Sequence, residues 1–112
     1  MNIYLDNNIF IYLEEGKISI SDLETLIENK IDKIFFSASH IQETLEIKGN
    51  DENQRNERIN QRLKTIANFS KNCYMNENLQ NEVYEYEESP FTVIETITEV
   101  SFAQNAVKGM TN

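Results

Sequence analysis

Cysteine, histidine, proline and glycine are scarce in this chain, and tryptophan is absent. The only cysteine, Cys73, has no partner for an intrachain disulfide and rules out a four-thiolate zinc site. No apolar run approaches the roughly 20 residues of a membrane-spanning helix. The N-terminal "MNIYLDNN" lacks the basic lead and the cleavage site of a signal peptide. We therefore expect a cytoplasmic protein without a membrane partner.

Positive charge is scarce as well. The chain has 10 Lys and Arg against 19 Asp and Glu, a net charge of -9, which argues against broad, charge-driven adhesion to nucleic acid. Residues 72–99 contain seven glutamates and neither Lys nor Arg, whereas all three arginines, Arg55, Arg58 and Arg62, lie in one short stretch. The two signs of charge are thus segregated along the chain.

The length of 112 residues suits one domain, residues 1–112. Compact β-favouring runs alternate with helix-like stretches: strands are predicted at 3–5, 33–36 and 72–76, and helices at 7–14, 21–29, 39–47, 51–70, near 79–86 and within 91–108. This order predicts an α/β fold with a small parallel sheet of about three strands flanked by helices. The first run is short and wholly apolar, so we expect a buried central strand.

The predicted helices have apolar faces and cap signals. Ser21 with Glu24, and Ser39 with Gln42, have the spacing of capping boxes, and Gly16 is placed to end the first helix. The apolar faces comprise Ile9, Phe10 and Leu13; Leu23, Leu26 and Ile27; and Ile59, Leu63 and Ile66.

Two acids follow two of the predicted strands. In a parallel α/β sheet, ligands bind beyond the carboxyl ends of the strands. Asp6 lies at that end of the first strand, and Glu43 lies in the first turn or so of the helix after the second. Neighbouring parallel strands would bring the two carboxylates close together. Two unpaired carboxylates repel each other, and a divalent cation such as Mg²⁺ removes that repulsion.

A structural role is the alternative for both acids. Asp6 is also placed to cap the helix that begins near Asn8, an interaction worth on the order of 1 kcal/mol. Glu43 is also placed to interact with the dipole of its helix. Spacing alone leaves both interpretations open.

The segments "IYLDNNIFIYLEEG" and "KIFFSASHIQETLEI" resemble the PIN and PIN-like nucleases. In that family the first strand ends in an Asp that precedes a small polar residue, an Asn and an apolar helix, and a later helix carries the next acid. The resemblance implies an Mg²⁺- or Mn²⁺-dependent endoribonuclease, often a toxin or a defence enzyme. It implies that Asp6 and Glu43 are catalytic metal ligands and that Asn8 supports the loop of the first acid. RNA is the implied substrate, and an antitoxin, a second subunit or a second copy of the chain is the implied protein partner.

The resemblance is good over residues 1–47 and fair to about residue 76, but the family's later acids are not found beyond that point. One explanation is that these residues are the N-terminal portion of a longer polypeptide, and another is a reduced family member. The rival hypothesis is a non-catalytic module that docks a basic protein partner through the acidic segment 77–99. A third is a phosphatase-like hydrolase at the same two carboxylates.

The remaining polar and aromatic candidates carry weaker predictions. Arg55, Arg58 and Arg62 form one helical stripe, which is suited either to nucleic-acid phosphates or to ion pairs with acids of the chain. We expect a partly exposed first-turn His40, with substrate positioning as the alternative.

We expect structural roles for the thiol and the tyrosines in the second half of the chain. We expect Cys73 to be a buried inert thiol. Tyr74, Tyr84 and Tyr86 are expected to pack at the core or its rim, with base stacking as the alternative.

Overall fold

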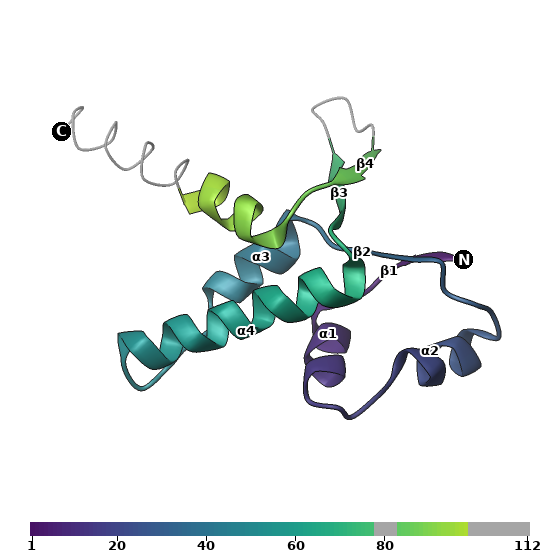
Figure 1. Cartoon of the computed structure of the whole chain (residues 1–112), viewed down its shortest axis with the longest axis horizontal. Helices are drawn as coiled ribbons and strands as arrows, with labels where there is room; N and C mark the ends of the chain where they lie inside the picture. The colour runs from purple at the N-terminus through teal and green to yellow at the C-terminus, as the bar shows by residue number, and fades with distance from the viewer. Residues whose placement is uncertain (78–82, 99–112) are drawn as a thin grey trace.

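The computed structural model describes residues 1–77 and 83–98, in which strands and helices alternate (Figure 1). The elements are β1 (Asn2–Tyr4), α1 (Asn7–Glu14), α2 (Ile20–Ile27), β2 (Lys33–Phe35), α3 (Ala38–Leu45), α4 (Glu52–Ser70), β3 (Cys73–Glu77) and β4 (Val83–Glu87). Residues 90–98 are also helical, and Pro90 occupies the first position, where its missing N–H has no cost. The predicted α/β class is confirmed.

The parallel sheet is smaller than predicted. β1 and β2 pair in parallel, with Tyr4 opposite Phe35, whereas β3 and β4 form an antiparallel hairpin. A single parallel bridge between Phe36 and Tyr74 joins the two sheets. The third strand therefore exists where it was predicted, but the parallel sheet itself has two strands, and its PIN-like arrangement stays a prediction.

Two strand predictions were wrong in detail. β1 is not a buried central strand, because within the described residues it pairs only with β2 and its end residues are exposed. The helix predicted near 79–86 is replaced over Val83–Glu87 by β4, while 78–82 lie outside the described residues, as does the predicted helix beyond residue 98. The strict alternation of Tyr and Glu over 84–87 has the period of two that is typical of a strand.

The core lies where α1, α3 and α4 pack around β2 and the end of β1 (Figure 1). The apolar stripe of α4 is buried as predicted, and Phe10 and Leu13 of α1 contact the same core. The buried residues of this core cluster are Leu5, Phe10, Leu13, Ile34, Phe36, Ile41, Ile59, Leu63, Ile66, Tyr74 and Val93. This cluster fixes the ends of β1 and β2 relative to the two helices that follow them.

Helix α2 packs less closely than its apolar face predicts. Figure 1 shows it apart from α1, α3 and α4, and Leu26 is 81% exposed. Leu23 and Ile27 are only partly buried.

The helix caps also differ from the sequence prediction. Ser19 with Asp22, and Ser37 with His40, take the N-cap and N3 positions of α2 and α3, two residues before the predicted caps. Gly16 follows α1 with a φ of 72°, as a terminating glycine should.

Candidate functional site

Asp6 lies between β1 and α1, where the chain turns from strand to helix. It is the N-cap residue of α1, and its backbone carbonyl accepts hydrogen bonds from the N–H groups of Ile9 and Phe10 at 3.0 and 3.4 Å. Its carboxylate makes no capping hydrogen bond and is exposed. The backbone of Asp6 thus begins the helix while its side chain stays available to a ligand.

Glu43 lies on α3, which begins directly after β2. Because the helix is capped at Ser37, Glu43 lies in the second helical turn, two residues further from the N-terminus of the helix than predicted. Its side chain is exposed, and no ion pair within residues 1–77 and 83–98 involves either Glu43 or Asp6. A helix-dipole role is therefore weak, because that effect is limited to the first turn.

His40 connects the two segments that carry these acids. Its imidazole Nε2 donates to the carbonyl of Leu5 at 2.6 Å, and the N–H of Ser37 donates to its Nδ1 at 3.0 Å. Both bonds require the neutral ring with its proton on Nε2, since a carbonyl only accepts and an N–H only donates. His40 thereby joins the end of β1 to the start of α3 across 35 residues of sequence.

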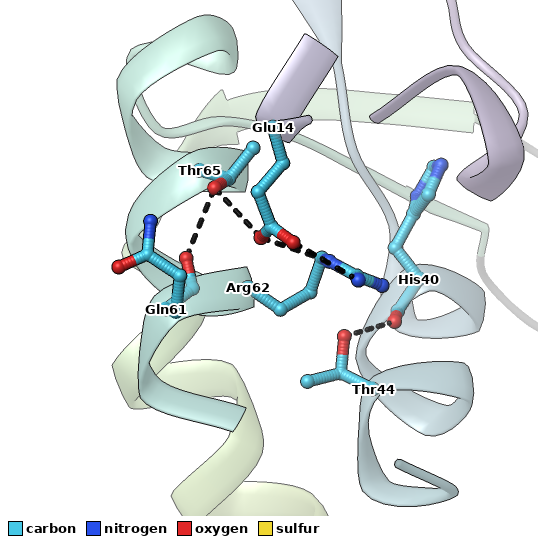
Figure 2. A network of polar contacts seen from close by, with 6 residues as sticks. All are labelled: Glu14, His40, Thr44, Gln61, Arg62 and Thr65. Atoms are coloured by element: carbon cyan, nitrogen blue, oxygen red, sulfur yellow. Dashed lines mark hydrogen bonds and ion pairs between the residues drawn. The ribbon is translucent and has the colours of Figure 1, made fainter. Parts of the chain in front are cut away.

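The expectation of a partly exposed His40 was wrong, because the residue is 2% exposed. Its ring lies 4.8 Å from the ring of Tyr4 and 5.1 Å from that of Phe10, centroid to centroid. Its carbonyl also accepts from the Thr44 hydroxyl at 2.8 Å (Figure 2). These contacts make it a structural residue of the core and leave it no free nitrogen for a substrate.

The pKa of His40 is shifted mainly by burial. Burial lowers this pKa below its ordinary value of 6.5, while the Leu5 carbonyl and the negative charges of Glu43 and Asp6 act in the opposite direction. Asp6 follows Leu5 directly in the chain, and Glu43 lies three residues beyond His40 on α3, so the hydrogen bond between His40 and Leu5 joins the segments that carry both acids. The fold brings the two predicted site residues to the same region, although they are 37 positions apart in the sequence.

Two hydroxyl groups at the same strand ends were not predicted from the sequence. The hydroxyl of Tyr4 and Oγ of Ser37 are 2.8 Å apart, and Tyr4 remains half exposed. The available signal was positional, since Ser37 follows the second strand as closely as Asp6 follows the first.

The two asparagines after Asp6 differ in their surroundings. The side chain of Asn8, the expected support for this loop, is exposed and has no hydrogen bond among the described residues. Oδ1 of Asn7 is buried and lacks a hydrogen-bond partner there. The loop is instead held by the His40 hydrogen bond to Leu5.

The arginine stripe contacts the protein itself. Arg55 donates to the carbonyls of Ile47 and Leu45 at 3.1 and 2.7 Å, and Arg58 donates to the carbonyl of Lys48 at 2.7 Å. These carbonyls lie at or just beyond the C-terminal end of α3, where helices leave acceptors unsatisfied. Nucleic-acid binding by the stripe stays a prediction.

Arg62 and Glu14 connect α4 to α1 (Figure 2). Nε and Nη2 of Arg62 donate to Oε1 and Oε2 of Glu14 at 3.1 and 3.2 Å, and the Thr65 hydroxyl donates to Oε1 at 2.9 Å. The Arg62 and Glu14 side chains are only 12% and 19% exposed. Among the described residues, Arg62 therefore pairs with Glu14 rather than with an acid of its own helix or of the acidic segment.

The expected buried thiol of Cys73 is only partly buried. Tyr74 is buried against Phe36 and Tyr86, and burial raises the pKa of its hydroxyl. Tyr84 and Tyr86 are about half exposed on the hairpin.

The donor set limits which ion this region can hold. No group of three or more His, Cys, Asp or Glu side chains suitable for a metal occurs in the part of the chain that is described. Two exposed carboxylates fit a hard cation that keeps most of its waters, as Mg²⁺ does. They do not fit a zinc site of nitrogen and sulfur ligands.

No helix within residues 1–77 and 83–98 has both the length and the apolarity to cross a bilayer. Protein-family models, curated proteins and solved structures include no match to this chain.

Proposed function

We propose that this chain is a PIN-like, Mg²⁺- or Mn²⁺-dependent endoribonuclease of the toxin or defence type, and that Asp6 and Glu43 hold the cation. One observation supports the proposal above the others: two exposed carboxylates without ion-pair partners among the described residues lie on the two segments that the His40–Leu5 hydrogen bond joins. A bound cation would supply charge stabilisation at the phosphoryl group and lower the pKa of a coordinated water.

The chain's own side chains have distinct tasks in this proposal. Asp6 and Glu43 supply oxygen ligands, and their mutual repulsion gives the site its preference for a divalent cation. His40 positions the two segments through its hydrogen bonds to Leu5 and Ser37. The half-exposed Tyr4 hydroxyl offers a hydrogen-bond donor to a phosphate oxygen at the same strand ends.

Titration of the chain with Mn²⁺, followed by calorimetry or by paramagnetic broadening of NMR signals, tests the cation site. Asp6→Asn and Glu43→Gln should each weaken Mn²⁺ binding by about tenfold or more, since each removes one of two charged ligands. Glu46→Gln is the matched control, because Glu46 is an exposed acid at the end of the same helix. Unchanged binding in both site variants would refute the proposed site.

Cleavage of single-stranded RNA in Mn²⁺ tests the reaction itself. We expect cleavage that Asp6→Asn abolishes and that the Glu46→Gln control retains. Hydrolysis of a phosphomonoester without cleavage of RNA would instead favour the phosphatase-like alternative.

A further inference from the structure

Strand β3 of the hairpin is covered on one side by β2. The N–H of Phe36 donates to the carbonyl of Cys73 at 3.0 Å, and the N–H of Met75 donates to the carbonyl of Phe36 at 2.8 Å. Cys73 and Met75 therefore turn their backbone groups toward β2. Because alternate residues of a strand turn these groups in opposite directions, Tyr74 and Asn76 turn theirs toward β4.

The same alternation defines the outer side of β4. In the hairpin register Tyr86 lies opposite Tyr74, and Tyr84 lies opposite Asn76, so these two tyrosines use their backbone groups toward β3. Glu85 and Glu87 consequently direct their N–H and C=O groups to the other side of β4. Among the described residues no strand pairs with that side.

The side chains beside this open edge are sorted by charge. Glu85 and Glu87 are exposed and line a hollow of about 350 Å³. Tyr84 and Tyr86 alternate with them and so lie on the opposite face, where the ring of Tyr86 is 5.3 Å from that of Tyr74. One face of the edge is thus acidic and the other aromatic.

We propose that the open edge of β4 accepts an extended segment of a protein partner as an added strand. The segment carries Lys or Arg at the alternate positions opposite Glu85 and Glu87, and apolar residues on the Tyr84 and Tyr86 face. Main-chain hydrogen bonds to an exposed edge supply affinity in this mode of recognition, and alternating side chains supply specificity. The inference is independent of the cation site and stands if that site fails.

Charge complementarity favours a basic strand as the occupant of the β4 edge. No Lys or Arg occurs in residues 72–99. Two lysines line the same hollow. Lys33 belongs to β2 and Lys71 lies just before β3, so both come from the opposite side of β3 or its start and neither lies on the open side of β4. An added strand would lie about 4.8 Å from β4, and its nearest charged neighbours would be the two glutamates.

A second copy of the chain and RNA fit the edge less well. Antiparallel pairing of β4 with β4 of another copy would place glutamates beside glutamates, and like charges in opposing positions destabilise a strand pair. RNA phosphates would meet the same negative charge. A basic strand from a different protein avoids both penalties.

A synthetic ten-residue peptide of alternating Lys and Val is the probe, tested against the full chain by calorimetry and by NMR. We expect binding that shifts the amide signals of residues 83–87 and slows hydrogen exchange at Glu85 and Glu87. The double variant Glu85→Gln/Glu87→Gln should bind about tenfold more weakly, because two cross-strand charge pairs are lost.

Two controls separate strand addition from plain charge attraction. Glu95→Gln removes an exposed acid of the same acidic segment that lies on the 90–98 helix, and it should leave binding unchanged. A peptide N-methylated on the backbone of every Lys carries the same charge but loses the N–H groups that Lys residues opposite Glu85 and Glu87 direct toward β4 in an antiparallel pair, and it should not bind. Equal binding of the methylated peptide would overturn the proposal.

Self-association measured by analytical ultracentrifugation gives the remaining outcome. Glutamates at an edge strand also serve to prevent pairing between identical chains. If Glu85→Gln/Glu87→Gln forms dimers and the unaltered chain binds no basic peptide, the glutamates only protect the edge, and the proposal is overturned.

Discussion

The chain has two acidic surfaces that are built in different ways. At the ends of β1 and β2, Asp6 and Glu43 are brought to one region by contacts between distant segments, above all the His40 hydrogen bond to Leu5 across 35 residues. On β4, Glu85 and Glu87 share a face because of strand alternation alone. The first surface is a product of tertiary packing, and the second is a product of local sequence.

This difference has a consequence for how each surface responds to mutation. A surface held by a buried polar residue loses its geometry when that residue changes, because its hydrogen-bond partners become unsatisfied. A surface set by alternation keeps its geometry as long as the hairpin exists. Substitutions in the core should therefore affect the proposed cation binding by Asp6 and Glu43 far more than they affect the β4 edge.

Replacing His40 should produce the largest effect. His40→Leu leaves the buried Leu5 carbonyl and the partly buried Ser37 N–H without partners, and the two unsatisfied groups together cost about 3 kcal/mol in the free energy of unfolding. Urea unfolding followed by circular dichroism measures this change. In the fraction that remains folded, Mn²⁺ binding should fall while peptide binding at β4 is retained.

Two companion variants sharpen this test. Thr44→Val removes a buried hydroxyl that donates only within its own helix, and it should cost about 1 kcal/mol. His40→Asn keeps an acceptor near Ser37 and should fall between the two. If His40→Leu is no more destabilising than Thr44→Val, the imidazole does not hold the two segments together.

Breaking the ion pair between α1 and α4 should produce the second-largest effect on stability. Arg62→Met or Glu14→Gln breaks a largely buried pair with two hydrogen bonds, and each substitution should cost about 2 kcal/mol. A double-mutant cycle analysed by urea unfolding should show that the two losses are not additive. The matched control is Glu15→Gln, which breaks the exposed pair with Lys17 and should leave the urea midpoint unchanged. Fully additive losses would contradict the interpretation.

Much of the fold follows from periodic patterns. The apolar faces of α1 and α4 were predicted from the sequence pattern; the α4 face is buried as expected, and in the α1 face Phe10 and Leu13 are buried while Ile9 is partly buried. Asp6 was placed correctly between strand and helix by the short apolar run before it. Local patterns of this kind need no knowledge of distant contacts, and for that reason they can be read from one sequence.

The features that were not predicted correctly depend on tertiary contacts or on a choice between competing sequence patterns. Nothing near His40 in the sequence indicates that its ring would meet Leu5, Tyr4 and Phe10. The partner of Arg62 lies 48 residues away. By contrast, the alternation that identifies β4 is present in the sequence, although a helix was predicted near 79–86.

Lowering the pH should produce the smallest of these effects, and it should weaken the Asp6 region without changing the β4 edge. Burial lowers the pKa of His40 in the folded chain, whereas the unfolded chain has the ordinary value of about 6.5. The folded state therefore binds fewer protons in the interval below pH 6.5, and the contribution of His40 to stability is complete above that pH and is lost as the pH falls. Since His40 is the only histidine, the difference between the unaltered chain and His40→Leu isolates this contribution.

Protonation of His40 should weaken the contacts that hold the region around Asp6. A proton on Nδ1 would displace the hydrogen bond from Ser37, so the charged ring keeps only one of its two bonds. Urea unfolding between pH 7.5 and 5 should show a stability difference between the two proteins that shrinks as the pH falls, by at most about 1.4 kcal/mol per pH unit. No histidine contributes to the β4 edge. A stability difference between the two proteins that stays constant with pH would mean that the His40 ring is already solvated. The contrast in pH response between the Asp6 region and the β4 edge would then fail.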